Sequence, residues 1–110
     1  MPKVYVPQEP SRFDPAFNMR IPIVDLRPAA QYGEVQVLLP DNVTGGMMHP
    51  VVAALKEKLA DYTKDDFVVA IGDPTIIAAV SGIILRRLGC MKILRWDKRL
   101  KLYQVVEIEL

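Results

Sequence analysis

The sequence predicts a small α/β protein that forms a single domain over residues 1–110. Strand-like apolar runs alternate with segments of helical spacing, and the last part of the chain reads as strand, turn, strand. The resulting order β-α-β-α-β-β implies two right-handed crossovers, a short parallel core and a last strand that runs antiparallel. A composition with 51% hydrophobic and 25% charged residues is typical of a folded domain of this length.

Residues 1–34 are predicted to be a proline-rich arm, because proline removes a backbone donor and restricts its neighbours. The segments Val4–Val6 and Ile21–Leu26 are expected only as short edge strands. The rest of the arm is expected to wrap the domain or to pair with a neighbouring chain. Six of the nine prolines lie here, namely Pro2, Pro7, Pro10, Pro15, Pro22 and Pro28.

The regular core is predicted over residues 35–110. A strand at Val35–Leu39 is followed by turn residues at 40–42. Pro50 is expected to open an amphipathic helix that extends to about Tyr62, since proline is favoured at the first helical position. The run Phe67–Ile71 is apolar throughout, which is typical of a strand buried on both faces.

A second helix is predicted over residues 74–88. Asp73 is a favoured N-cap, Pro74 a favoured first residue and Gly89 a favoured residue after the last turn. The helix is apolar on almost all sides, so one sheet is not enough to cover it. The sequence therefore predicts that this helix packs against the arm or against its own copy in a homodimer.

The C-terminal hairpin carries the strongest charge asymmetry. The segment from Arg86 to Lys101 holds seven basic residues against one acid, Asp97. Aromatic residues beside arginine suit stacking on bases or contact with anionic partners. This segment is predicted to bind nucleic acid or an acidic protein; the alternatives are a solvated hairpin tip or a contact with the acidic surface of another protomer. The candidate binding residues are Arg86, Arg87, Lys92, Arg95, Trp96, Lys98, Arg99, Lys101 and Tyr103.

The sequence Gly72-Asp73-Pro74 lies where ligands bind in parallel α/β sheets, at the carboxyl end of a strand. Asp73 would repel phosphate from the helix N-terminus, so the corner is interpreted mainly as a helix start. His49 and Asp73 are the weak catalytic candidates, as an acid–base pair or, with Asp41, as part of a metal site.

The numbers of cysteine and histidine residues limit the kinds of disulfide and metal site that the chain can form. The chain has one cysteine, Cys90, and one histidine, His49, which excludes an internal disulfide and a multi-histidine metal site. We expect no cofactor and no bound metal. The first residues lack the apolar centre of a secretory signal, and no apolar run approaches the ~20 residues of a membrane span, so no membrane partner is expected.

Three segments carry a family resemblance: LLPD at residues 38–41, LADY to IGDP at 59–74, and KILRWDKRLKLYQVVEIEL at 92–110. In these the sequence resembles a family of short, uncharacterised proteins of tailed bacteriophages. The resemblance implies a phage accessory protein in the host cytoplasm. The corner is also weakly similar to that of small viral ring nucleases, which degrade cyclic oligoadenylate and have a histidine where this chain has Asp73.

Taken with the residue patterns, the resemblance favours a function in binding nucleic acid or a host protein rather than in catalysis. Two alternatives remain open from the sequence. One is a small nucleotide hydrolase that uses the edge formed by His49 and Asp73. The other is a purely structural or assembly protein.

Overall fold

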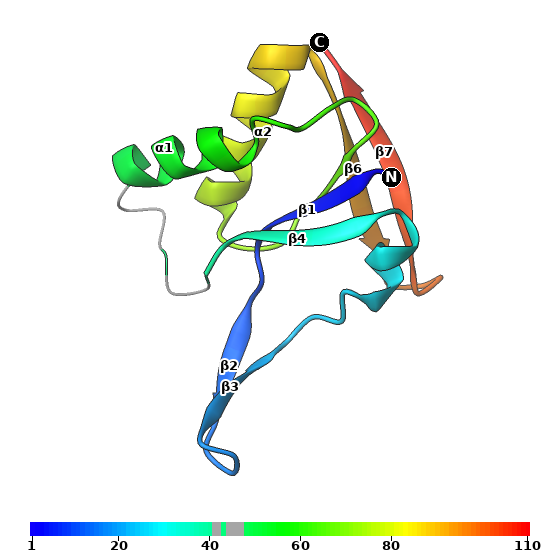
Figure 1. Cartoon of the computed structure of the whole chain (residues 1–110). Helices are drawn as coiled ribbons and strands as arrows, with labels where there is room; N and C mark the ends of the chain where they lie inside the picture. The colour runs from blue at the N-terminus through cyan, green and yellow to red at the C-terminus, as the bar shows by residue number, and fades with distance from the viewer. Residues whose placement is uncertain (41–42, 44–47) are drawn as a thin grey trace.

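A computed structural model describes residues 1–40, 43 and 48–110 of the chain (Figure 1). It confirms the α/β class and the mixed sheet, whose strand order is β4-β1-β5-β6-β7. The first four strands of this order are mutually parallel, and β7 is antiparallel to β6, as predicted. The elements are β1 (Lys3–Gln8), β2 (Ser11–Asp14), β3 (Met19–Pro22), a 3-10 helix η1 (Arg27–Gln31), β4 (Glu34–Leu39), α1 (Met48–Lys58), β5 (Phe67–Val69), α2 (Pro74–Leu88), β6 (Cys90–Asp97) and β7 (Leu102–Glu109).

The prediction that Val4–Val6 is an edge strand is wrong. These residues belong to β1, which lies inside the sheet between β4 and β5 and is almost completely buried. Pro7 is tolerated because the pairing of β1 with the short strand β5 covers Val4 and Tyr5 and ends before the proline. β5 therefore has no carbonyl oxygen opposite Pro7, so the missing N–H of the proline leaves no acceptor on β5 without a donor.

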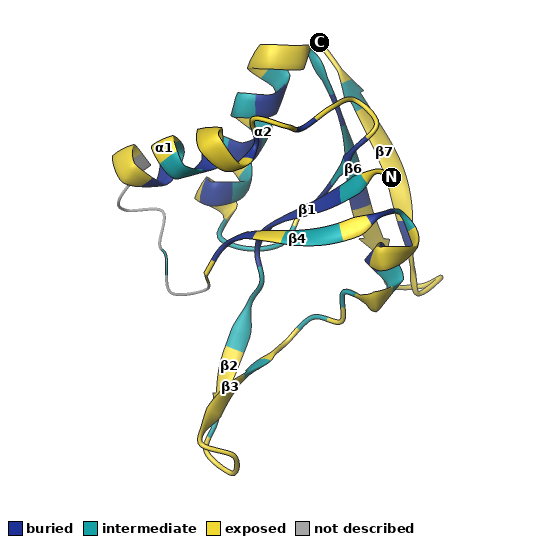
Figure 2. Ribbon diagram, in the orientation of Figure 1, coloured by how far each residue is buried: buried dark blue, intermediate teal, exposed yellow. Residues whose placement is uncertain are grey.

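The edge strand predicted at Ile21–Leu26 exists with other bounds, because residues 23–26 are not part of it. The strand there, β3, ends at Pro22 and pairs antiparallel with β2 in a separate two-stranded sheet. We call residues 11–22 the ribbon. It projects away from the rest of the molecule (Figure 1), and most of its length is exposed or half-buried (Figure 2). Asp14-Pro15 and Asn18 form its turn, with Asn18 at a φ of 50°.

Both helices pack on one face of the sheet. Leu55 of α1, Leu59 directly after it, and Ile76, Val80 and Ile84 of α2 share a core cluster with residues of the strands. Strand alternation places Tyr5, Val68 and Met91 on this face. α1 begins at Met48, two residues before the predicted start at Pro50, and ends at Lys58 rather than near Tyr62.

The opposite face carries a second cluster built from Val4, Val6, Val69 and Leu94. The chain around η1 covers it, with Ala29 fully buried. Tyr32, directly after η1, stands edge-on to Phe67 at 5.5 Å and donates a hydrogen bond to the carbonyl oxygen of Tyr103 at 3.1 Å. The N-terminal region therefore contributes one central strand and one covering segment to the core.

The predicted bounds of the second helix are confirmed. Asp73 is the N-cap, Pro74 is the first residue and Gly89 takes a left-handed conformation with a φ of 73° after the last turn. Its cover is incomplete within one chain, because Ala78 and Gly82 are exposed. No helix in the described residues is long and apolar enough to cross a membrane.

Candidate binding surfaces

The Gly72-Asp73-Pro74 corner is a structural joint. The Asp73 carboxylate accepts a hydrogen bond from the backbone N–H of Thr75 at 2.8 Å, so it caps α2. The backbone N–H of Asp73 donates to the side-chain oxygen of Gln8 at 3.0 Å. Gly72 has a φ of 123°, and a Cβ there would lie 2.7 Å from the Cβ of Gln8. These groups hold the start of α2 against the end of β1.

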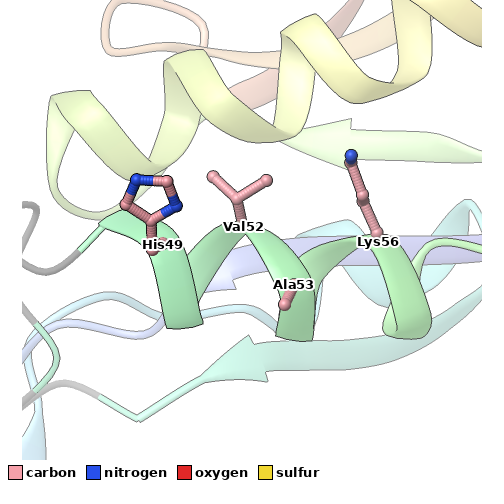
Figure 3. Close-up of a pocket in the computed structure, with 4 residues that line it drawn as sticks. All are labelled: His49, Val52, Ala53 and Lys56. Atoms are coloured by element: carbon pink, nitrogen blue, oxygen red, sulfur yellow. The ribbon is translucent and has the colours of Figure 1, made fainter.

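His49 lies in the first turn of α1 and is exposed. It lines an open hollow of about 400 Å³ with Val52, Ala53 and Lys56. Figure 3 shows that the hollow's lining residues come from successive turns of α1. Asp73 is not among these lining residues, and Asp41 lies outside the described part of the chain. Within the described residues, no three metal-ligating side chains of the His, Cys, Asp and Glu types gather in one place.

The structure separates the predicted basic surface into two groups. Arg86 and Arg87 end α2, next to the start of β6, whereas Lys98, Arg99 and Lys101 occupy the turn after β6. A strand of eight residues separates them, which corresponds to roughly 26 Å. Between the two groups, the ammonium of Lys92 lies 5.4 Å from the centre of the Phe67 ring, a cation–π distance.

The basic tip, defined as residues 98–101, is an exposed turn. The Asp97 carboxylate accepts hydrogen bonds from the backbone N–H groups of Arg99 and Leu100, both at 2.9 Å. The one acid of this segment is thus part of the turn itself. Trp96 packs edge-on against the buried Tyr103 with ring centres 4.9 Å apart, and it keeps 40% of its surface exposed.

Arg87, one of the predicted binding residues, has structural contacts within the chain. Its guanidinium donates hydrogen bonds to the carbonyl oxygens of Leu59 at 2.9 Å, Ala60 at 3.1 Å and Tyr62. These carbonyls all lie directly beyond the end of α1. Arg87 therefore ties the two helices together.

The exposed side of α2 borders a groove between the helices with a volume of about 760 Å³. Val52, Ala79, Gly82, Ile83 and Arg86 are among the residues that line it. The predicted homodimer contact through helix 74–88 would fall on this groove. The dimer itself stays a prediction.

The ribbon belongs to the part of the arm that was expected to wrap the domain or to pair with a neighbouring chain; it does not wrap the domain, and its pairing with another chain stays a prediction. Phe13, Phe17, Met19 and Ile23, on the ribbon and directly after it, are each more than half exposed, with Phe17 at 72%. Large exposed apolar side chains that occur together mark interaction sites more often than single ones do. The signal was present in RFDPAFNMRI, where Asp-Pro and Asn are turn residues between two strand-like segments.

The fold and these surfaces define a small α/β protein with one projecting ribbon that exposes apolar side chains and a basic turn at the end of its main sheet. The chain belongs to the family described as Phage Pam3 gp32-like protein, whose model matches residues 2–110. It is therefore a phage protein, in agreement with the resemblance of its sequence motifs. No curated protein and no solved structure matches the chain.

Proposed function

We propose that this phage protein acts by binding a protein partner through the ribbon. The observation that carries the proposal is the exposure of Phe13, Phe17 and Met19 on a two-stranded sheet separate from the main one. An isolated two-stranded hairpin is marginally stable in water. A partner that covers the ribbon would remove apolar area from water and stabilise it, at roughly 1.5–3 kcal/mol for each large side chain fully buried.

The construction of the turn supports this proposal. The Asp14 carboxylate accepts a hydrogen bond from the backbone N–H of Ala16 at 2.9 Å, which orders the turn. At the base of the ribbon, the guanidinium of Arg20 donates to the hydroxyl and the carbonyl oxygen of Ser11 at 2.8 and 3.0 Å. The side chain of Phe17 is thus presented from an ordered turn, as suits an anchor residue that enters a pocket.

A photo-crosslinking experiment in infected cells tests the proposal. A photoreactive phenylalanine analogue at position 17 is expected to give a discrete crosslinked protein, whereas the same analogue at Leu100, also exposed at 53%, gives none. The crosslinked protein is then purified, and Phe17→Ser is expected to weaken its binding at least tenfold. Equal crosslinking from both positions, or unchanged affinity of Phe17→Ser, would contradict the proposal.

A second candidate function is nucleic-acid binding at the basic tip. It is supported by the exposure of Lys98, Arg99 and Lys101 beside the half-exposed Trp96. Phosphate contacts release counterions, so the affinity for an oligonucleotide is expected to fall steeply with salt. Alanine at these three positions is expected to abolish the salt-dependent part of the affinity for the oligonucleotide. Alanine at Arg12, Lys56 and Lys64, three exposed cations elsewhere, is the matched control. Equal losses in both variants would refute a role of the tip.

A further inference from the structure

Strand β7 ends the five-stranded sheet, and in the described part of the chain no strand pairs with its outer edge. It is eight residues long and contains no proline. Leu102, Val105 and Val106 are 43%, 47% and 37% exposed. A long apolar edge of this kind presents unpaired N–H and C=O groups that can accept a further strand. The ring of Tyr103 is buried under its own chain, and its carbonyl oxygen accepts one hydrogen bond from the Tyr32 hydroxyl, which leaves its second lone pair for a partner strand. Val105 and Val106 therefore form the centre of the open segment.

Charge is divided between the two ends of this strand. Lys98, Arg99 and Lys101 precede it, and Glu107 and Glu109 lie in its last part, all of them exposed. Leu102 and Glu109, the two ends of β7, are seven positions apart, which corresponds to roughly 24 Å, so Lys101 in the turn directly before β7 cannot contact Glu109 within one chain. An identical strand that runs in the opposite direction would bring each basic end beside an acidic end.

We propose that β7 pairs antiparallel with β7 of a second copy, so that two sheets join into one of ten strands. The two-fold axis passes beside Val105. This arrangement places Leu102 opposite the partner's Ile108, and it brings Lys101, in the turn directly before β7, beside the partner's Glu109. The proposal names a different surface from the groove on α2, and it is independent of the partner of the ribbon.

The register follows from two constraints. Residues directly opposite in an antiparallel pair point to the same face of the sheet. A two-fold axis perpendicular to the joined sheet relates the two copies without exchanging the two faces of the sheet. The residue opposite a given residue, in the partner's β7, therefore has a sequence number that differs from it by an even number. An axis beside Glu107 would place two identical carboxylates opposite each other, which is unfavourable, whereas the axis beside Val105 pairs opposite charges and apolar side chains.

Charge reversal tests the pairing directly. The dimer dissociation constant of the wild type is measured by sedimentation velocity and native mass spectrometry. Lys101→Glu places like charges at both ends of the interface, and so does Glu109→Lys. Each variant alone is expected to raise the dissociation constant about tenfold, since two cross-strand charge contacts change sign.

The two variants mixed in equal amounts are expected to form a heterodimer of wild-type affinity, because both contacts then join opposite charges. The double variant Lys101→Glu/Glu109→Lys is expected to recover a homodimer. Val105→Lys, at an exposed position, is expected to prevent pairing while the monomer stays folded, as judged by its melting temperature. Gly82→Glu, on the α2 groove, is the control that leaves this dimer intact.

Several results would overturn the proposal. One is a wild-type protein that is monomeric at millimolar concentration, and another is a dimer that Gly82→Glu disrupts while the charge variants leave it unchanged. Failure of the mixed variants to associate would also refute it. Nucleic-acid binding is distinguishable, because Lys101→Glu weakens both processes whereas Glu109→Lys weakens only the dimer.

Discussion

Gln8 at the end of β1 is hydrogen-bonded to Asp73 at the start of α2. The Gln8 side-chain oxygen accepts from the Asp73 backbone N–H at 3.0 Å, and its amide nitrogen donates to the carbonyl oxygens of Pro40 at 2.9 Å and Val43 at 2.7 Å. The side chain is buried, with 5% of its surface exposed. One amide thus joins three chain segments that leave the same edge of the sheet.

Gln8→Met is expected to lower the free energy of unfolding by about 2–4 kcal/mol. The substitution keeps the volume and leaves buried backbone groups without partners, each at a cost of roughly 1–3 kcal/mol. Urea unfolding followed by circular dichroism measures the change. Gln104→Met, at an exposed position, is the control and is expected to change stability by less than about 0.5 kcal/mol. Equal effects of the two variants would contradict the role assigned to Gln8.

Two glycines are expected to respond to alanine with opposite signs. Gly72→Ala introduces a Cβ 2.7 Å from the Cβ of Gln8 at a φ of 123°, so a loss of about 2–4 kcal/mol is expected. Gly82 lies within α2, and a Cβ there meets no atom within 4 Å. Gly82→Ala is therefore expected to stabilise the protein by about 0.5–1 kcal/mol. Thermal unfolding of both variants checks the difference in sign.

The adjacent residues Arg86 and Arg87 are expected to differ in their effect on stability. Arg87→Lys removes the planar fork that reaches three carbonyl oxygens beyond α1, so we expect a loss of about 1–2 kcal/mol. Arg86→Lys keeps an exposed charge among the residues that line the groove and is expected to be neutral. Denaturant midpoints that shift equally for both variants would show that Arg87 has no special role in joining the helices.

Stability is expected to fall between about pH 10 and pH 12. Burial raises the pKa of Tyr62 to about 12 from its ordinary value near 10. Because the folded pKa is the higher one, the neutral phenol contributes its full stabilisation below pH 10 and loses it as the pH rises through the folded value. A shift of this size corresponds to on the order of 2–3 kcal/mol. Unfolding measured from pH 9 to 12 is expected to show a shallower decline for Tyr62→Phe than for the wild type.

Local sequence signals predicted the second helix with correct bounds, because Asp73, Pro74 and Gly89 each act on the adjacent backbone. The antiparallel hairpin at the C-terminus was predicted for the same reason. The position of β1 was not predictable in this way. Its prolines indicated an edge strand, and only the early end of β5 makes Pro7 compatible with a place inside the sheet.

The candidate surfaces, too, were predictable from the sequence only in part. The sequence identified the basic residues as a group, since they are close along the chain. An extended strand then separates Arg86 and Arg87 from the turn at residues 98–101. The Arg87 guanidinium donates to carbonyl oxygens just beyond α1 that are 25 to 28 positions away, which no local pattern reveals.

The sequence by itself determined the α/β class, the helix caps and the charge asymmetry, because each depends on residue type and short spacing. The tertiary structure decided that the Gly72-Asp73-Pro74 corner is a joint held by Gln8, 65 positions away from Asp73. It also decided which apolar residues remain in water. Phe17 and Val105 are no more polar than Val6 or Leu94, and only the packing of distant segments buries the latter pair and leaves the former exposed.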